Sequence, residues 1–122
     1  MTTLYEFKTH LIRCASEKKG IDIREYDVKK NIWHTDYILV IGVSNAIHCK
    51  SMVNEISHQF NTADVNVLSE IGVDSLIQSG KENAGWVILD MGNLIIHCIS
   101  VEQRAFYKLD ELYEVQGTVF HH

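Results

Sequence analysis

The sequence predicts an α/β (α+β) protein built on a single mixed sheet of about five strands flanked by helices. Residues 37–43, 86–90 and 94–100 are short apolar runs rich in β-branched side chains, as in buried strands. Over 46–71, apolar residues recur every three or four positions, which is the period of an amphipathic helix. Because the run at 37–43 is apolar throughout, it needs cover on both faces, which indicates helices on both sides of the sheet.

The N-terminal segment is predicted to form a helix followed by a strand. Thr3 and Glu6 have the spacing of a capping box, and Gly20 after two lysines is typical of a helix end. The helix is therefore expected over about 3–19. Residues 21–28 alternate partly and predict a strand, which a polar connector joins to the next one.

The middle of the chain predicts one long helix or a pair of helices. Ser44 is placed to cap the start of this segment. Residues 61–64 have weak helix propensity, so the stripe over 46–71 leaves both arrangements open. A short strand is then expected over 73–78, and the composition of 79–85 predicts a loop.

The C-terminal part predicts a β-hairpin and a last helix. A glycine separates the last two apolar runs, so a hairpin is the simplest connection between them. Ser100 and Gln103 repeat the capping-box spacing, which predicts a helix over about 101–113. The residues expected to line one face of this helix are Phe106, Leu109, Leu112 and Tyr113.

Length and composition indicate one globular domain. The chain has 122 residues, 46% of them apolar, with no proline and a net charge of −5, which suits a single hydrophobic core. We expect residues 1–115 to form the domain and the aperiodic residues 116–122 to be a flexible C-terminal tail. The acidic balance argues against binding a nucleic-acid backbone, which needs clustered lysine and arginine.

The cysteines and the N-terminal residues predict a cytoplasmic protein. Cys14, Cys49 and Cys98 are odd in number and lack CxxC spacing, which fits free thiols in a reducing compartment. The first residues lack the apolar core of a signal peptide. No apolar run approaches the roughly 18 residues that a membrane helix needs, so no membrane association is expected.

No pattern in the chain predicts catalysis, a cofactor or a metal site. The adjacent pairs His48-Cys49 and His97-Cys98 point in different directions in a helix or a strand, so neither chelates one ion by itself. The segment GVSNA at 42–46 lacks the glycines and the lysine of phosphate-binding loops. The chain has no GxSxG motif, and Asp90 has no second acid beside it for two-metal chemistry.

A candidate protein-binding surface lies at the C-terminal hairpin. Trp86 opens its first strand, and Asp90 and Met91 follow at the turn. An aromatic side chain and a methionine beside an acid are typical of protein interfaces. The sequence leaves an alternative open, in which Trp86 packs under the sheet and Asp90 merely shapes the turn.

The hairpin and last helix, over 85–113, resemble the signature of the ribosomal silencing factor family, also called Iojap-like proteins. The residues that match this signature in order and spacing are Trp86, Asp90, Gly92, His97, Arg104, Tyr107, Leu109 and Leu112. Upstream, Thr35-Asp36-Tyr37, Gly42, Ser44 and His48 are similar to the family's strand-to-helix segment. The resemblance covers about residues 4–113. The chain departs from the pattern at Asn93, where the family usually has Asp, and at Tyr113, where it has Trp.

The resemblance implies a translation regulator without enzymatic activity. Such factors bind the fourteenth protein of the large ribosomal subunit and sterically block association with the small subunit, which represses translation under nutrient limitation. The family fold is nucleotidyltransferase-like, so the alternative is a small nucleotide-binding enzyme of that kind. The implied partner is the large ribosomal subunit, with no cofactor and no direct nucleic-acid recognition. A homodimer off the ribosome is left open.

On this resemblance, the residues expected at the partner contact are Trp86, Asp90, Met91, Gly92, Asn93, Arg104 and Tyr107. In this hypothesis Trp86 and Met91 are apolar anchors, and Gly92 permits close approach. Asp90 meets a basic side chain of the partner. Arg104 and Tyr107, one helical turn apart, either brace the hairpin or extend the surface.

Overall fold

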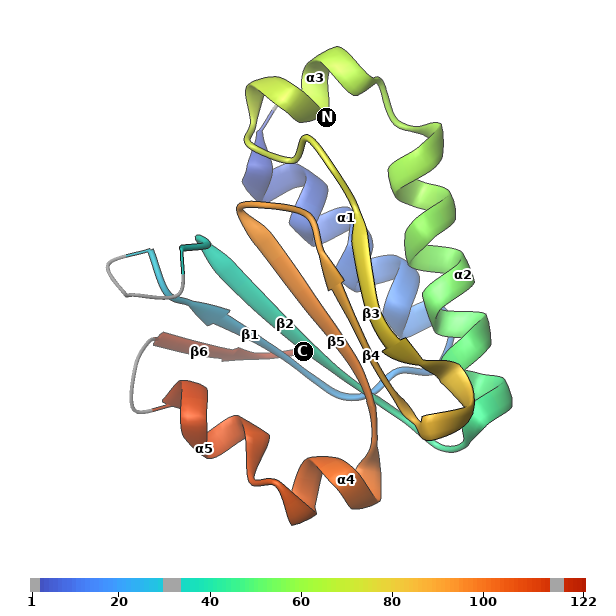
Figure 1. Cartoon of the computed structure of the whole chain (residues 1–122). Coiled ribbons are helices and arrows are strands. Elements are labelled where there is room, and N and C mark those ends of the chain that lie inside the picture. The colour runs from blue at the N-terminus through green and yellow to red at the C-terminus, as the bar shows by residue number, and fades with distance from the viewer. Residues whose placement is uncertain (1–2, 30–33, 115–117) are drawn as a thin grey trace.

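A computed structural model of the chain describes residues 3–29, 34–114 and 118–122 and has one mixed sheet with helices on both faces (Figure 1). Its elements in chain order are α1 (Leu4–Glu17), β1 (Ile21–Asp27), β2 (Tyr37–Val43), α2 (Ala46–Thr62), α3 (Val65–Glu70), β3 (Ile77–Lys81), the 3-10 helix η1 (Glu82–Ala84), β4 (Trp86–Asp90), β5 (Leu94–Ser100), α4 (Val101–Phe106), α5 (Leu109–Glu114) and β6 (Thr118–His121). The predicted fold class and the three central strands are confirmed.

The strands of the sheet lie in the order β3-β4-β5-β2-β1-β6. The pair β2–β5 is parallel, and the other four pairs of described strands are antiparallel. The β4–β5 hairpin thus joins the sheet beside β2, the strand that is apolar throughout. This arrangement makes β3 one edge of the sheet and places it beside the strand that begins with Trp86.

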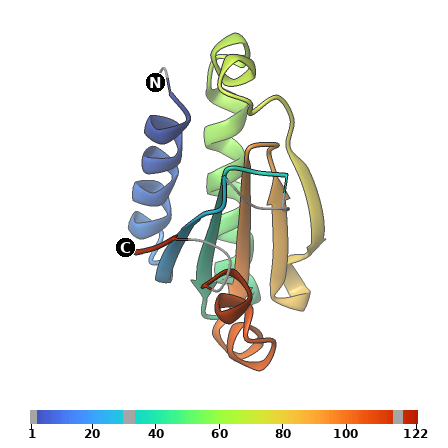
Figure 2. The ribbon, with the colours of Figure 1, turned by 90° about the vertical axis from the view of Figure 1, so that its left-hand side faces the viewer.

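Helices α1 and α2 cover one face of the sheet, which we call the first face (Figure 2). Strand residues that alternate with one another, such as Leu39, Ile41, Leu89 and Ile96, point into this main core and are fully buried. Lys8 of α1 forms an ion pair with Glu25 of β1 within the same layer.

Helices α4 and α5 pack on the second face and lie together at one end of the sheet (Figure 1). The buried residues of this smaller core are Tyr26, Val28, Ile38, Val40, Ile99, Leu109 and Tyr113. They come from β1, β2, β5 and α5 and the residue after β1. The five residues of β3, in contrast, are all exposed, so cover on the second face does not extend to that edge.

The helical segment after β2 is a pair, which was one of the two predicted arrangements. Its break lies at Ala63 and Asp64, and the Asp64 side chain caps α3 by accepting from the backbone N–H of Asn66. The predicted cap at Ser44 is wrong. The side-chain oxygen of Asn45 accepts the backbone N–H of His48, so Asn45 is the residue that caps α2. Ser44 instead donates its backbone N–H to Nδ1 of His48.

Three further expectations are corrected in the second half of the chain. The strand expected at 73–78 lies at Ile77–Lys81, and the helix expected at 101–113 is broken by a turn at Tyr107 and Lys108, the second of which has a φ of 51°. The tail at 116–122 was expected to lack regular structure, but Thr118–His121 pairs with β1 as a sixth strand. Edge pairing of this kind depends on a distant strand, so the hydrophobic periodicity within the segment does not predict it.

Candidate functional site

The second face of the sheet is uncovered along β3 and β4, and we call this region the open sheet face. Strand alternation and the register of the β3–β4 pair place its six residues on one side: Ile77, Ser79, Lys81, Trp86, Ile88 and Asp90. The burial of β4 shows the same asymmetry, since Val87 and Leu89 on the first face are fully buried while Trp86, Ile88 and Asp90 are half-buried. Trp86 and Asp90 therefore share a surface, with Ile88 between them.

The C-terminal end of α4 extends this surface with two aromatic side chains, those of Phe106 and of the following residue, Tyr107. Tyr107 is 58% exposed and Phe106 is 78% exposed. The Tyr107 ring centroid lies 5.4 Å from that of Trp86 and 4.9 Å from that of Phe106. Trp86, Tyr107 and Phe106 thus form a continuous aromatic row that runs from β4 onto α4.

The Trp86 indole is held in place from inside the fold. Its Nε1–H donates to Nδ1 of His97 at 3.0 Å, and Nε2 of His97 lies 2.9 Å from the hydroxyl of Tyr113. Burial lowers the pKa of His97 to about 4, so the ring is neutral near pH 7. The polar atom of Trp86 is satisfied within the chain, and its ring carbons are what the surface presents.

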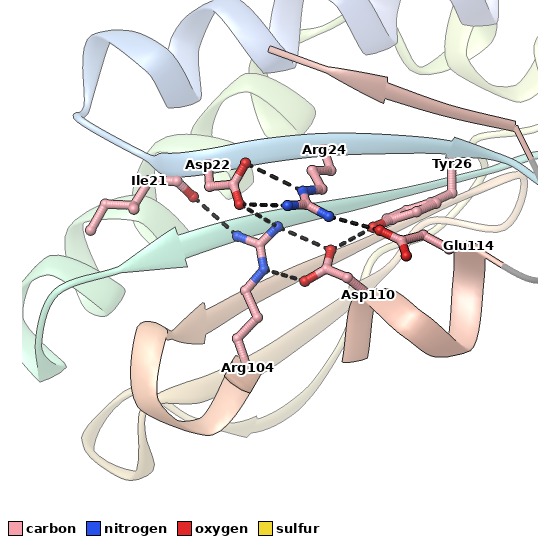
Figure 3. Close-up of polar contacts among 7 residues, drawn as sticks. All are labelled: Ile21, Asp22, Arg24, Tyr26, Arg104, Asp110 and Glu114. Atoms are coloured by element: carbon pink, nitrogen blue, oxygen red, sulfur yellow. Dashed lines mark hydrogen bonds and ion pairs between the residues drawn. The ribbon is translucent and has the colours of Figure 1, made fainter. Parts of the chain in front are cut away.

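Arg104 does not lie on the surface but under α4, against the sheet (Figure 3). Its Nε donates to Oδ2 of Asp110 at 2.6 Å, its Nη2 to Oδ1 at 3.1 Å, and its Nη1 to the backbone carbonyl of Ile21 at 3.1 Å. The arginine therefore joins α4, α5 and the start of β1. The sequence left two roles open for Arg104, bracing the hairpin or extending the surface. The contacts described here instead hold α4 and α5 to β1.

Tyr26 completes this buried polar cluster, and Arg24 lies at its more exposed rim. The hydroxyl of Tyr26 donates to Oδ1 of Asp110 at 2.5 Å, and Arg24 bridges Glu114 and Asp22 at the rim (Figure 3). Burial acts to raise the pKa of Asp110, but hydrogen bonds from Arg104 and Tyr26 outweigh it and hold that pKa below its ordinary value. Asp110 is thus a carboxylate with two donors inside the fold. We call Arg104, Asp110 and Tyr26 the clamp.

The β4–β5 turn is shaped by contacts within the chain. Oδ1 of Asp90 accepts the N–H of Gly92 at 2.9 Å, and the N–H of Asn93 donates to the carbonyl of Gly72 at 3.0 Å. Gly92 has a φ of +90°, and a Cβ on it would lie 2.7 Å from the Gly72 carbonyl oxygen. The close approach that needs a glycine here is therefore to Gly72, and the turn is tied to the segment after α3.

Met91 is fully buried in the main core. The expectation that it is an exposed anchor beside Trp86 is corrected, because the side chain after Asp90 turns to the first face of the hairpin. The predicted site residues consequently divide into three groups. Trp86, Asp90 and Tyr107 lie along the surface, Gly92 and Asn93 form the half-buried turn, and Met91 and Arg104 are buried.

The surface also contains residues that the sequence reading missed. Ile88 could have been found from the alternation within 86–90. Ile77 was inside the strand expected at 73–78, but the observed strand is Ile77–Lys81, and its pairing with Asp90 was not predicted. Phe106 and Leu112 were expected to share one helix face with Leu109 and Tyr113. The helix is broken at Lys108, and Phe106 and Leu112 are exposed while the other two are buried. No sequence signal marks Tyr26 and Asp110 as partners, since they are 84 residues apart.

Within residues 3–29, 34–114 and 118–122, no three His, Cys, Asp or Glu side chains are grouped so that they could hold a metal ion. None of the described helices has the length and apolar character needed to cross a membrane.

Comparison with known proteins relates the chain to a family. The family model described as "Ribosomal silencing factor during starvation" matches residues 2–120. The chain is 31% identical over 108 residues to protein Iojap, chloroplastic, of Zea mays, covering 88% of this chain and 43% of that protein. It is 26% identical over 99 residues to the ribosomal silencing factor RsfS of Bacillus subtilis, covering 81% of this chain and 77% of that protein.

Solved structures share the fold. A crystal structure of a protein from Chromobacterium violaceum has a TM-score of 0.72 at 23% identity, covering 91% of this chain and 86% of that chain. Another, from Bacillus halodurans, has a TM-score of 0.67 at 21% identity, covering 89% of this chain and 94% of that chain. The chain spans less than half the length of the maize relative and most of the length of the bacterial ones.

Proposed function

The chain belongs to the ribosomal silencing factor family, and on that premise we propose that it binds the large ribosomal subunit in the cytoplasm and blocks association with the small subunit. Translation is thereby repressed under nutrient limitation. In this proposal the contact is made with the fourteenth protein of the large subunit, and the chain acts as a steric block without catalysis. The maize and B. subtilis relatives are named for Iojap and ribosomal silencing, not for an enzymatic reaction.

The open sheet face and the aromatic row are the surface that we assign to this contact. They combine half-buried Trp86 and Ile88 with exposed Ile77, Phe106 and Tyr107. Aromatic residues dominate the binding energy of protein interfaces when they lie near the centre of a patch. The uncovered edge of the second face, with Trp86 held in it, is the single observation that carries the proposal.

Charge and size are compatible with a basic protein partner. The chain has a net charge of −5, although on the open sheet face itself Asp90 is balanced by Lys81. A basic patch on the partner would therefore be attracted before contact by the charge of the whole chain. A specific interface buries about 800 Å² on each partner, which is about an eighth of the 6686 Å² surface of this chain. One face is therefore sufficient.

Co-sedimentation with isolated large subunits tests the proposal. Trp86→Ala should weaken binding by more than about 2 kcal/mol, or about thirtyfold, because it removes the central aromatic side chain. The matched control is Ile47→Ala, since Ile47 is 83% exposed on α2, in the layer that covers the first face. The control variant should bind like the wild type and should still prevent joining of the two subunits in a light-scattering assay.

Two results would overturn the assignment. If the wild type does not co-sediment at micromolar concentration, the ribosomal function fails. If Trp86→Ala and Ile47→Ala bind equally well, the function stands but the contact lies elsewhere.

Titration with nucleoside triphosphates and magnesium tests the enzyme alternative, because saturable binding would contradict a purely steric role. Sedimentation of the free protein reports whether the same face pairs two copies off the ribosome.

A further inference from the structure

We propose that His97 and Tyr113 are positioning residues that fix the orientation of the Trp86 indole before a partner binds. The inference rests on the proposed function, because Trp86 is the anchor assigned there. It adds a role to residues that lie beneath the surface. His97 is 4% exposed and Tyr113 is buried, so neither can be a principal contact itself.

The hydrogen bonds define which atoms carry protons. An indole Nε1–H can only donate, so Nδ1 of His97, 3.0 Å away, must accept and be unprotonated. Nε2 then carries the ring proton and donates to the hydroxyl of Tyr113 at 2.9 Å. Because burial keeps His97 neutral near pH 7, this tautomer is the stable state of the ring, and the acceptor for Trp86 is permanent.

The register of the sheet brings His97 beneath this surface. His97 pairs with Ile88 across the β4–β5 ladder, so its side chain lies on the same face as those of Trp86 and Ile88. The centroids of the His97 and Trp86 rings are 6.0 Å apart, and Tyr107 contacts the indole at 5.4 Å. The indole is therefore constrained by one hydrogen bond and two ring contacts.

Tyr113 is itself held by the second core. Its ring packs against Tyr26 at 5.5 Å between centroids and against His97 at 5.7 Å. Tyr26 donates to Asp110, which Arg104 binds. A continuous set of contacts thus runs from the clamp through Tyr113 and His97 to Trp86. The position of α5 on the sheet and the orientation of the indole are physically linked.

A pre-oriented anchor favours binding, because immobilising a free side chain on association costs affinity. That cost corresponds to about two- to tenfold in Kd for one rotamer-rich side chain. A Trp86 that rotates freely would present the same carbon atoms to a partner but would lose this factor. The structure therefore predicts a moderate loss of affinity when the acceptor at Nδ1 is removed, in contrast to the large loss in Trp86→Ala.

Two amide substitutions of His97 distinguish the roles of its two ring nitrogens. In His97→Asn the amide oxygen can occupy the position of Nδ1 and accept from Trp86, whereas in His97→Gln the terminal amide reaches the position of Nε2 and contacts Tyr113. Both variants place an uncharged amide at the same buried position, so each controls for the other. They are made in a Trp33→Phe background, which leaves Trp86 as the one tryptophan of the chain.

The first measurement is hydrogen exchange of the Trp86 indole N–H by NMR, which needs no partner. The indole should exchange slowly in the background protein and in His97→Asn, and at least tenfold faster in His97→Gln. Co-sedimentation with large subunits should then show about fivefold weaker binding for His97→Gln than for the Trp33→Phe protein. His97→Asn should bind with nearly the same affinity as the Trp33→Phe protein. The fold-changes correspond to loss of one neutral hydrogen bond.

The outcomes distinguish this inference from the proposed function. If the background protein does not bind large subunits, the proposed function fails, and the indole exchange rates still decide whether His97 positions Trp86. If exchange is equally slow in both folded variants, or if both bind equally well, the positioning role is wrong. Should His97→Gln fail to fold, Tyr113→Phe replaces it, and unchanged indole exchange in that variant would also overturn the proposal.

Discussion

Replacing Arg104 by methionine is expected to destabilise the protein by about 3 kcal/mol. The guanidinium makes two hydrogen bonds to Asp110 and one to the carbonyl of Ile21, and its side chain is 8% exposed. Removing one partner of a buried ion pair costs about 3–5 kcal/mol. We take the lower end, because the Asp110 side chain is 18% exposed and water can reach it. Methionine fills a similar volume, so the change reports the lost polar contacts.

Urea unfolding, monitored by circular dichroism, measures this change. With a urea dependence of about 1–3 kcal/mol per molar for a small domain, the midpoint should fall by about 1–3 M. Arg104→Lys should lie between the wild type and Arg104→Met, since an ammonium keeps the charge but not the two parallel bonds. Adding Asp110→Asn to Arg104→Met should recover part of the loss, because the uncompensated carboxylate is then absent.

Arg24→Met is the matched control for this prediction. Arg24 belongs to the same group of side chains, but its side chain is 22% exposed and its partners Asp22 and Glu114 are 50% and 41% exposed (Figure 3). Ion pairs of this kind contribute about 0–1 kcal/mol. If Arg104→Met destabilised the protein no more than Arg24→Met, the clamp would not be what holds α4 and α5 on the sheet.

Two further predictions concern pH and the turn. Because the pKa of His97 is about 4 in the fold and about 6.5 when unfolded, only the unfolded chain takes up this proton between these values. The difference in the His97 pKa should therefore lower the unfolding free energy of the wild type by about 3 kcal/mol as the pH falls from 6.5 to 4, beside the contributions of other groups. In denaturation series at matched pH, His97→Asn should lose less than the wild type, and parallel curves of unfolding free energy against pH would contradict the assignment. Gly92→Ala should destabilise by about 2 kcal/mol or more, since the residue has a φ of +90° and its Cβ would meet a backbone oxygen at 2.7 Å. Gly85→Ala is its control, because Gly85 has a similar φ of +78° and the nearest neighbour of an added Cβ is the end of the flexible Gln103 side chain. If urea unfolding shows that both variants lose the same unfolding free energy, the contact with Gly72 is unimportant.

The parts of the fold that could be predicted are those whose signal is local. The boundaries of β2, β4 and β5 follow from short, predominantly apolar runs, and the start of α1 follows from its capping residues. The Thr3 hydroxyl accepts the N–H of Glu6, and Ser100 likewise caps α4. Each of these signals depends on side chains within a few positions of one another.

The elements that were misplaced depend on distant partners. Strand β6 exists because β1 offers an unpaired edge, and β3 is positioned by its pairing with β4. The break between α4 and α5 lets Leu109 and Tyr113 pack on the second face. In one continuous helix these two side chains would point in other directions. Composition within the segment does not contain this information.

For the candidate site, the sequence by itself identified the hairpin, Trp86, Asp90 and Tyr107 as residues of interest, because alternation and spacing predict which side chains share a face. It could not determine which face remains uncovered. Only the tertiary structure places Met91 in the core, Arg104 beneath α4 and His97 behind Trp86. The physical reason is that burial is set by whatever packs on a strand, and the covering residue can be distant in the chain, as Tyr113 of α5 is from His97, 16 positions away.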